Sequence, residues 1–75
     1  MLTELIEIIK DTFLPTIVVT GDTALKTDLA LDSFEIINLI GILEDKYKIE
    51  INVIDIVSLI TLEDICNYIA NKKMP

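Results

Sequence analysis

Ser33 is the side chain in this sequence whose type and surroundings are best suited to chemistry. It follows Asp32 and precedes Phe34 and Glu35, between a polar segment and a long apolar one. Asp32 is predicted to cap a helix, because its carboxylate can accept hydrogen bonds from first-turn N–H groups; Glu35, three residues on, fits a capping box. Ser33 then takes the first helical position, with its hydroxyl in solvent. The partial positive charge of a helix start favours an anionic group attached there.

On the Asp-Ser pair alone, a simple helix-initiating serine is the favoured interpretation, so the surrounding sequence must decide. Other chemistry is scarce. The sequence has no histidine, which excludes an imidazole base for serine or cysteine catalysis and a histidine-cysteine zinc site. Its glycines, Gly21 and Gly41, form no phosphate-binding loop. The one cysteine, Cys66, lies in an apolar helical pattern that favours a structural thiol. We therefore expect no enzyme activity and no metal site.

Three segments carry apolar residues at three- and four-residue steps, the pattern of amphipathic helices. The first starts at Leu2 and ends before Pro15, which disfavours helical geometry in the preceding residue. The second starts at Ser33, and the third follows Thr61, a predicted cap with an acidic residue three positions on. The core face of the second helix is predicted to consist of Ile36, Leu39, Ile40, Leu43 and Tyr47. That of the third consists of Leu62, Ile65, Cys66 and Ile69.

Two connecting segments are less regular. Residues 15–32 contain the turn signal Gly21-Asp22 and predict a long loop, with Ile17–Val19 extended against the core and a helical turn near Thr23–Leu25. Residues 53–59 suit a short helix, although their β-branched side chains would also suit a strand. We predict an all-α fold, a four-helix bundle with three longer helices, one short third helix and a long loop between helices one and two. It forms a single domain over residues 1–75.

Composition limits the partners. The net charge is -7 and the six lysines are scattered, which argues against nucleic acid and against anionic membrane surfaces. No apolar run approaches the roughly 18 residues of a membrane span, and the N-terminus lacks the pattern of a signal peptide. We therefore expect a cytoplasmic protein, a monomer, whose partner proteins present basic patches.

The run Asp28-Leu29-Ala30-Leu31-Asp32-Ser33-Phe34-Glu35 resembles the modification-site region of acyl carrier proteins. The resemblance is close over residues 28–51, a range that includes Leu43-Glu44-Asp45 and Tyr47. It is looser from Ile60 to Ile69. It implies that Ser33 carries 4'-phosphopantetheine, which a phosphopantetheinyl transferase transfers from coenzyme A. Acyl chains would then travel as thioesters on this arm between enzymes of fatty acid biosynthesis. The family's four-helix fold agrees with the pattern of the helices.

The chain departs from the family pattern near the serine. Phe34 replaces the usual leucine, Asn38 replaces an acid, and Lys46 interrupts an acidic run. From Ser33 to Lys48, three acids against two lysines leave a net charge of -1. Helical spacing places an apolar strip beside Ser33, so the predicted partner-binding residues are Phe34, Glu35, Ile37, Gly41, Glu44 and Asp45. The alternative is that Phe34 and Ile37 only pack against the long loop.

Three functions remain open from the sequence. The first is a free-standing acyl carrier protein of fatty acid biosynthesis. The second is a specialised carrier for polyketide, nonribosomal peptide or aminoacyl cargo, which the departures at Phe34 and Asn38 suggest. The third, from a different class, is an unmodified acidic helical module that binds a basic partner. The three differ in whether Ser33 is modified and in which enzymes accept the modified protein.

Overall fold

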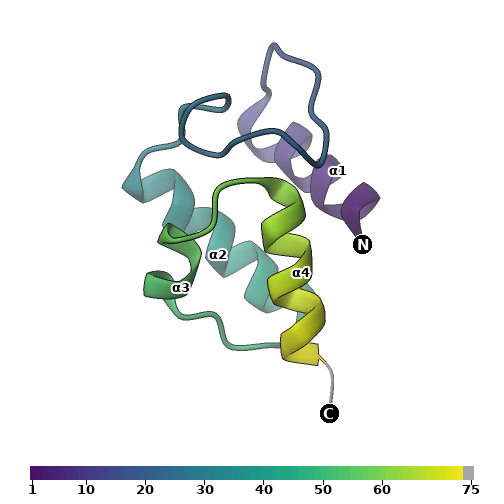
Figure 1. Ribbon diagram of the computed structural model, residues 1–75, viewed down its shortest axis with the longest axis vertical. Coiled ribbons are helices and arrows are strands. Elements are labelled where there is room, and N and C mark those ends of the chain that lie inside the picture. Colours follow the sequence, from purple (N-terminus) through teal and green to yellow (C-terminus); the bar gives the residue numbers. More distant parts are fainter. Residues whose placement is uncertain (74–75) are drawn as a thin grey trace.

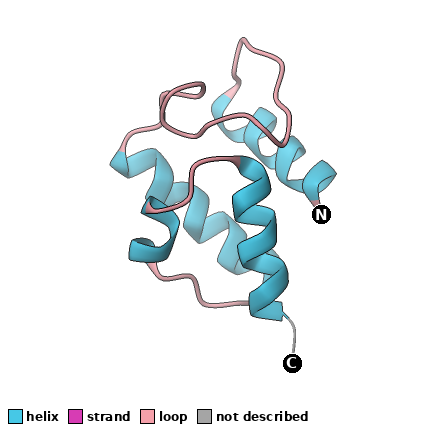
Figure 2. Ribbon diagram, viewed as in Figure 1, coloured by secondary structure: helices cyan, strands magenta, loops and turns pink. Residues whose placement is uncertain are grey.

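Four helices make up the regular structure of residues 1–73, the part of the chain that the computed structural model describes (Figure 1). They are α1 (Leu2–Phe13), α2 (Ser33–Tyr47), α3 (Val53–Val57) and α4 (Leu62–Lys73). Figure 2 shows no strand in these residues, and their only β-type pairing is an isolated antiparallel bridge between Ala24 and Thr61. The predicted all-α bundle, with its short third helix and long first loop, is confirmed.

The core is made almost entirely of leucine and isoleucine. All five residues of the predicted core face of α2 are buried, and so are Leu62, Ile65 and Ile69 of α4, whereas Cys66 is half-buried. α1 contributes Leu5 and Ile9, both fully buried. Burying such a side chain stabilises the fold by about 1.5–3 kcal/mol. The helical period thus predicted which faces are buried, and the structure adds that α1 packs on α4 and α2 on α3.

The helix ends follow the predicted signals. α1 ends at Phe13, before Pro15, and its C-cap Leu14 takes a left-handed conformation with φ 48°. At the start of α4, Thr61 Oγ1 accepts a hydrogen bond from the Asp64 N–H at 3.2 Å. Asp64 Oδ2 in turn accepts from the N–H groups of Thr61 and Ile60 at 3.0 and 3.1 Å. These backbone hydrogen bonds, that from Thr61 first, hold the pKa of Asp64 below its usual value.

The long loop, residues 14–32, is fixed to the start of α4. The Glu63 and Leu62 N–H groups donate to the carbonyls of Gly21 and Thr23 at 2.9 and 3.2 Å. The Leu25 N–H donates to the Ile60 carbonyl at 2.9 Å, and the Leu25 side chain is 1% exposed.

Two details of this loop differ from the prediction. Of residues 17–19, only Val19 is buried, and Val18 is 86% exposed, so one side chain rather than three contacts the core. The turn expected near 23–25 lies at 25–28, closed by a hydrogen bond from the Asp28 N–H to the Ala24 carbonyl at 3.1 Å. The shift has a physical reason: Ala24 forms the bridge to Thr61, so the chain can turn only after it.

Side-chain hydrogen bonds hold α3 in place despite its five residues. Asn52 Oδ1 caps it by accepting from the Ile54 N–H at 2.9 Å. Asp55 Oδ2 accepts from the Tyr68 hydroxyl of α4 at 2.8 Å, and Ile56 is buried. Such fixing is needed because a helix this short is unstable alone. The strand alternative for this segment is not adopted.

Candidate attachment site

Ser33 begins α2 and is exposed, as its predicted position requires. The capping box is complete: Asp32 Oδ1 accepts from the Glu35 N–H at 2.9 Å, and Glu35 Oε1 accepts from the Asp32 N–H at 3.1 Å. These reciprocal bonds fix the backbone on both sides of Ser33. Within the described residues, the serine hydroxyl itself forms no hydrogen bond. It is a free group on a rigid base.

A cavity of about 300 Å³ opens beside Ser33. Its walls come from three elements: the start of α2, the exposed side of α3 and the end of the long loop. The lining is mostly aliphatic and consists of Lys26, Leu31, Asp32, Ser33, Ile36, Ile37, Val53 and Val57. The hydroxyl therefore stands at the edge of an apolar hollow that an attached flexible group could enter.

The loop wall of this cavity is positioned by backbone pairing. The Leu31 N–H donates to the Leu25 carbonyl at 3.1 Å, and both leucine side chains are buried. Ala30 completes the turn with φ 54°, a conformation that costs free energy for a residue other than glycine. This pairing brings Lys26, seven residues before Ser33 in sequence, to the same cavity as the serine.

A second cavity of about 200 Å³ is also lined by Lys26. It shares Lys26 and Val57 with the first, so the two hollows meet at these side chains. Its remaining lining is Ala24, Thr27, Leu59 and Ile60.

The predicted apolar strip on α2 is at the surface. Phe34 is 84% exposed and Ile37 is 53% exposed. A methyl group added at Gly41 would meet no atom within 4 Å. The alternative, in which both apolar side chains pack against the long loop, is therefore wrong for Phe34; Ile37 lines the cavity at its edge.

The predicted acids have more varied surroundings. Glu35 takes part in the capping box, and Glu44 Oε2 accepts a hydrogen bond from the Ile51 N–H at 2.9 Å, closing the turn after α2. Asp45 is the most open of the three, with Oδ1 4.0 Å from the Lys48 ammonium. Two of the three acids thus have a structural task in addition to their charge.

Sequence analysis did not predict four of the cavity residues: Lys26 and Leu31 from the loop, and Val53 and Val57 from α3. The lone lysine in the polar loop was a signal, but no local pattern says that it returns to Ser33. Among residues 1–73, no helix is long and apolar enough to cross a membrane. The same residues contain no cluster of three histidine, cysteine, aspartate or glutamate side chains that could hold a metal ion.

Comparison with known proteins identifies the family. The family model for a phosphopantetheine attachment site matches residues 3–69, nearly the whole chain. The chain belongs to the phosphopantetheine attachment-site family. The family is defined by a site at which phosphopantetheine is attached, so this chain contains a domain of that type.

Relatives of this family member include acyl carrier proteins of Campylobacter. That of Campylobacter jejuni strain RM1221 is 48% identical over 46 residues, or 61% of this chain and 60% of the relative. That of Campylobacter jejuni subsp. doylei is 46% identical over the same length and shares. The acyl carrier protein of Campylobacter lari is 37% identical over 54 residues, 72% of this chain and 70% of its own. For the two Campylobacter jejuni proteins, the match thus covers about 60% of the relative's length.

The surroundings of Ser33 fit the group that the family carries. A phosphodiester needs an accessible hydroxyl, and Ser33 is exposed. It gains from the free N–H groups and partial positive charge of a first helical turn. An acyl cargo at the end of the arm needs a surface that shields it from water, and the adjoining cavity of about 300 Å³ has a mostly aliphatic lining that could supply one.

Proposed function

We propose that this chain is an acyl carrier protein and that Ser33 is its phosphopantetheine attachment point. The observation that carries the proposal is the position of the Ser33 hydroxyl, exposed on a capped helix start at the edge of an apolar cavity. Residues 1–75 would act as one carrier domain in the cytosol. The names of the Campylobacter relatives support the same role.

In the loading step, Ser33 Oγ would form the new P–O bond as the bond inside the pyrophosphate of coenzyme A breaks. Adenosine 3',5'-diphosphate leaves, and the serine proton passes to the transferase. The bound group supplies a terminal thiol that holds acyl chains as thioesters. The chain's own contribution is positioning: Asp32 and Glu35 fix the attachment point, while Ile36, Val53 and Val57 offer apolar contact to a chain that folds back.

Partners are proposed to dock on α2 beside Ser33. They comprise the phosphopantetheinyl transferase and enzymes of fatty acid biosynthesis that process acyl chains. The exposed strip of Phe34, Ile37 and Gly41 would supply apolar contact. Glu35, Glu44 and Asp45 would face basic patches, with Asp45 the freest of the three. Binding would be less dominated by charge than on a strongly acidic helix, because this helix has few net charges.

A specialised carrier is the second candidate. Phe34 favours it, because an aromatic ring that is 84% exposed directly after the attachment residue changes what every partner must accommodate. To separate the candidates, the modified protein is offered to a malonyl transferase of fatty acid synthesis and to adenylating ligases for amino acids. Exclusive aminoacylation supports the second candidate with an amino acid or peptide cargo, and efficient malonyl transfer without aminoacylation excludes that cargo.

Intact-protein mass spectrometry tests the attachment. The protein is incubated with coenzyme A, magnesium and a transferase of broad specificity, and we expect one phosphopantetheine added per chain. Ser33→Ala should abolish the addition. Ser58→Ala is the matched control, since Ser58 is the only other serine and is also exposed. No addition to the unaltered chain, or addition that persists in Ser33→Ala, would refute the proposal and favour an unmodified interaction module.

A further inference from the structure

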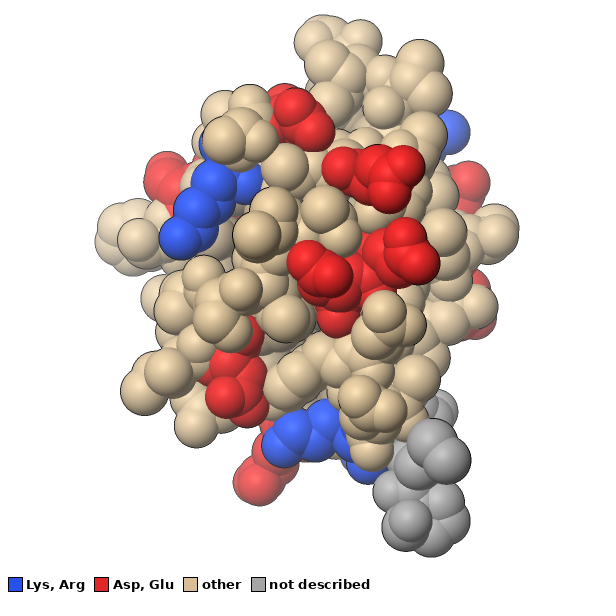
Figure 3. Space-filling model, in the orientation of Figure 1, with Lys and Arg blue, Asp and Glu red and all other residues tan. Residues whose placement is uncertain are grey.

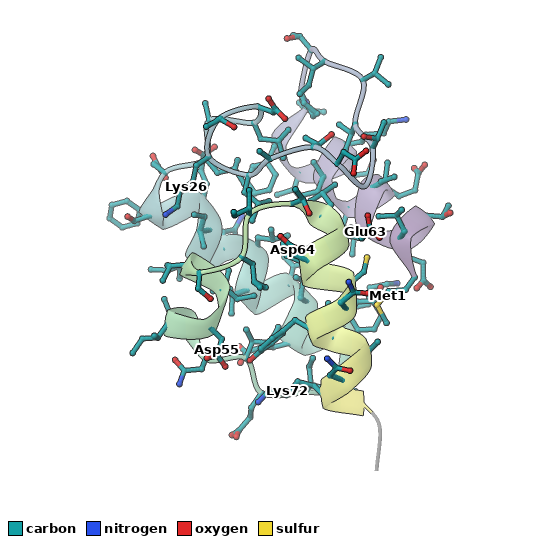
Figure 4. All side chains as sticks on the ribbon, viewed as in Figure 1. Met1, Lys26, Asp55, Glu63, Asp64 and Lys72 are labelled. Atoms are coloured by element: carbon teal, nitrogen blue, oxygen red, sulfur yellow. The ribbon has the colours of Figure 1, made fainter. Side chains whose placement is uncertain are left out.

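We propose that Lys26 is a positioning residue for the attached group: its ammonium pairs with the phosphodiester on Ser33 and directs the arm along the cavity. The inference rests on the proposed function, because it assumes that Ser33 is modified. Lys26 and Ser33 line the same cavity, and Figure 4 shows the Lys26 side chain beside the first turn of α2.

The backbone keeps Lys26 near the serine. Leu25, its neighbour, is held on two sides: its N–H donates to Ile60 at 2.9 Å and its carbonyl accepts from Leu31 at 3.1 Å. The Leu25 side chain is buried, whereas Lys26 is exposed. Leu31 lies two residues before Ser33, and the same pairing therefore fixes both ends of the cavity wall.

Lys26 also has no competing partner. The nearby acids are Asp28, Asp32 and Glu35, and each accepts a hydrogen bond from a backbone N–H at 2.8 to 3.1 Å. None lies within ion-pair distance of Lys26, because the only salt bridge among the described side chains, residues 1–72, joins Lys48 and Asp45. An ammonium without a partner at a built cavity is available to an anionic ligand.

The charges around the cavity favour pairing between Lys26 and the phosphodiester. The sequence has no arginine, and Lys26 is the only cation that lines either cavity. Figure 3 shows lysine side chains separated from one another on a surface with many acids. The covalent bond holds the phosphate at Ser33, on the same cavity as Lys26, so pairing requires no diffusion and little ordering. Without Lys26, the negative charge of the phosphodiester would be repelled by the three nearby acids.

Lys26 lines both cavities, so its pairing with the phosphate would influence the direction in which the arm leaves Ser33. A phosphate held by Lys26 would set the start of the arm toward the hollow between α2 and α3, lined by Val53 and Val57. Without the pairing, the arm would leave Ser33 freely into solvent. The residue would thus influence how often cargo is shielded.

The test compares Lys26→Gln with Lys10→Gln, which removes the same charge from an exposed position on α1. Each protein is prepared unmodified and modified, with modification confirmed by mass. Two quantities are measured: the ³¹P resonance of the phosphodiester, and the difference in Tm between modified and unmodified protein. We expect Lys26→Gln to shift the resonance and to lower the Tm difference by about 2–4 °C at low salt. In 1 M NaCl this loss should disappear, because the screening length falls to about 3 Å.

Lys26→Arg should retain the Tm difference of the unaltered chain, since it keeps the charge. If Lys26→Gln and Lys10→Gln behave alike in both measurements while Ser33 is fully modified, the inference is wrong and the proposed function stands. If Ser33 takes no phosphopantetheine in the unaltered chain, both are wrong. Salt-independent loss in Lys26→Gln would indicate packing of the lysine stem rather than ion pairing, and would also overturn the inference.

Discussion

Asp32→Ala should destabilise the fold by about 1 kcal/mol, the typical loss for replacing an N-cap aspartate by alanine. The structure supports this magnitude because Asp32 Oδ1 accepts from the Glu35 N–H at 2.9 Å and no other side chain caps α2. For a domain of this size, 1 kcal/mol corresponds to a fall of about 4–8 °C in Tm. Asp32→Asn should change little, since asparagine caps as well as aspartate.

The capping box adds a second test. Glu35→Ala removes the return bond to the Asp32 N–H at 3.1 Å, which is exposed and thus partly replaced by water. Because the two bonds hold one another, the double variant should lose less than the sum of the single variants. The assay is thermal unfolding of unmodified protein followed by circular dichroism, with hydrogen exchange at the Glu35 amide. An Asp32→Ala protein as stable as Asp32→Asn, or an equally protected Glu35 amide, would refute the reasoning.

Two further predictions concern stability. Gly41→Ala should stabilise the fold by about 1 kcal/mol, because alanine has a higher helix propensity than glycine and the added methyl meets nothing within 4 Å. Urea unfolding measures the change in stability, and a loss of stability would show that the added methyl is crowded. Burial, with a hydrogen bond to Glu4, raises the pKa of Tyr47 to about 12. The unfolded state therefore loses this proton first, from about pH 10, and stability should fall as the pH rises from there toward 12. Tyr47→Phe should flatten that fall in urea unfolding at stepped pH, and an unchanged slope would contradict the assignment.

The helices and the attachment residue could be predicted because their determinants are local. The 3.6-residue period alone separates Ile36 and Leu39 from Phe34, and the cap at Asp32 depends on residues within one turn. The cavity could not be predicted in the same way. Its walls include Lys26 and Val57, which meet Ser33 only through loop pairing and the placement of α3.

The acids of α2 likewise show what local sequence predicts and what depends on the tertiary structure. Sequence spacing placed Glu44 and Asp45 together on α2, and both were predicted to face partners. The structure distinguishes them, because Glu44 bonds the Ile51 N–H while Asp45 remains open. A carboxylate's task depends on which backbone group comes within reach, and the turn after α2 decides that.

The attachment of the long loop to the start of α4 has a consequence for synthesis of the protein. The segment that leads to Ser33 is held by the backbone of residues 60–63, which the ribosome adds well after the serine. A nascent chain that ends before them lacks the hydrogen-bond partners of Gly21, Thr23 and Leu25. The loop that leads to the serine would then not be fixed in place. A transferase that recognises the assembled surface would then act only on chains completed through α4. Attachment of phosphopantetheine would thus wait until the loop is fixed and folding is complete.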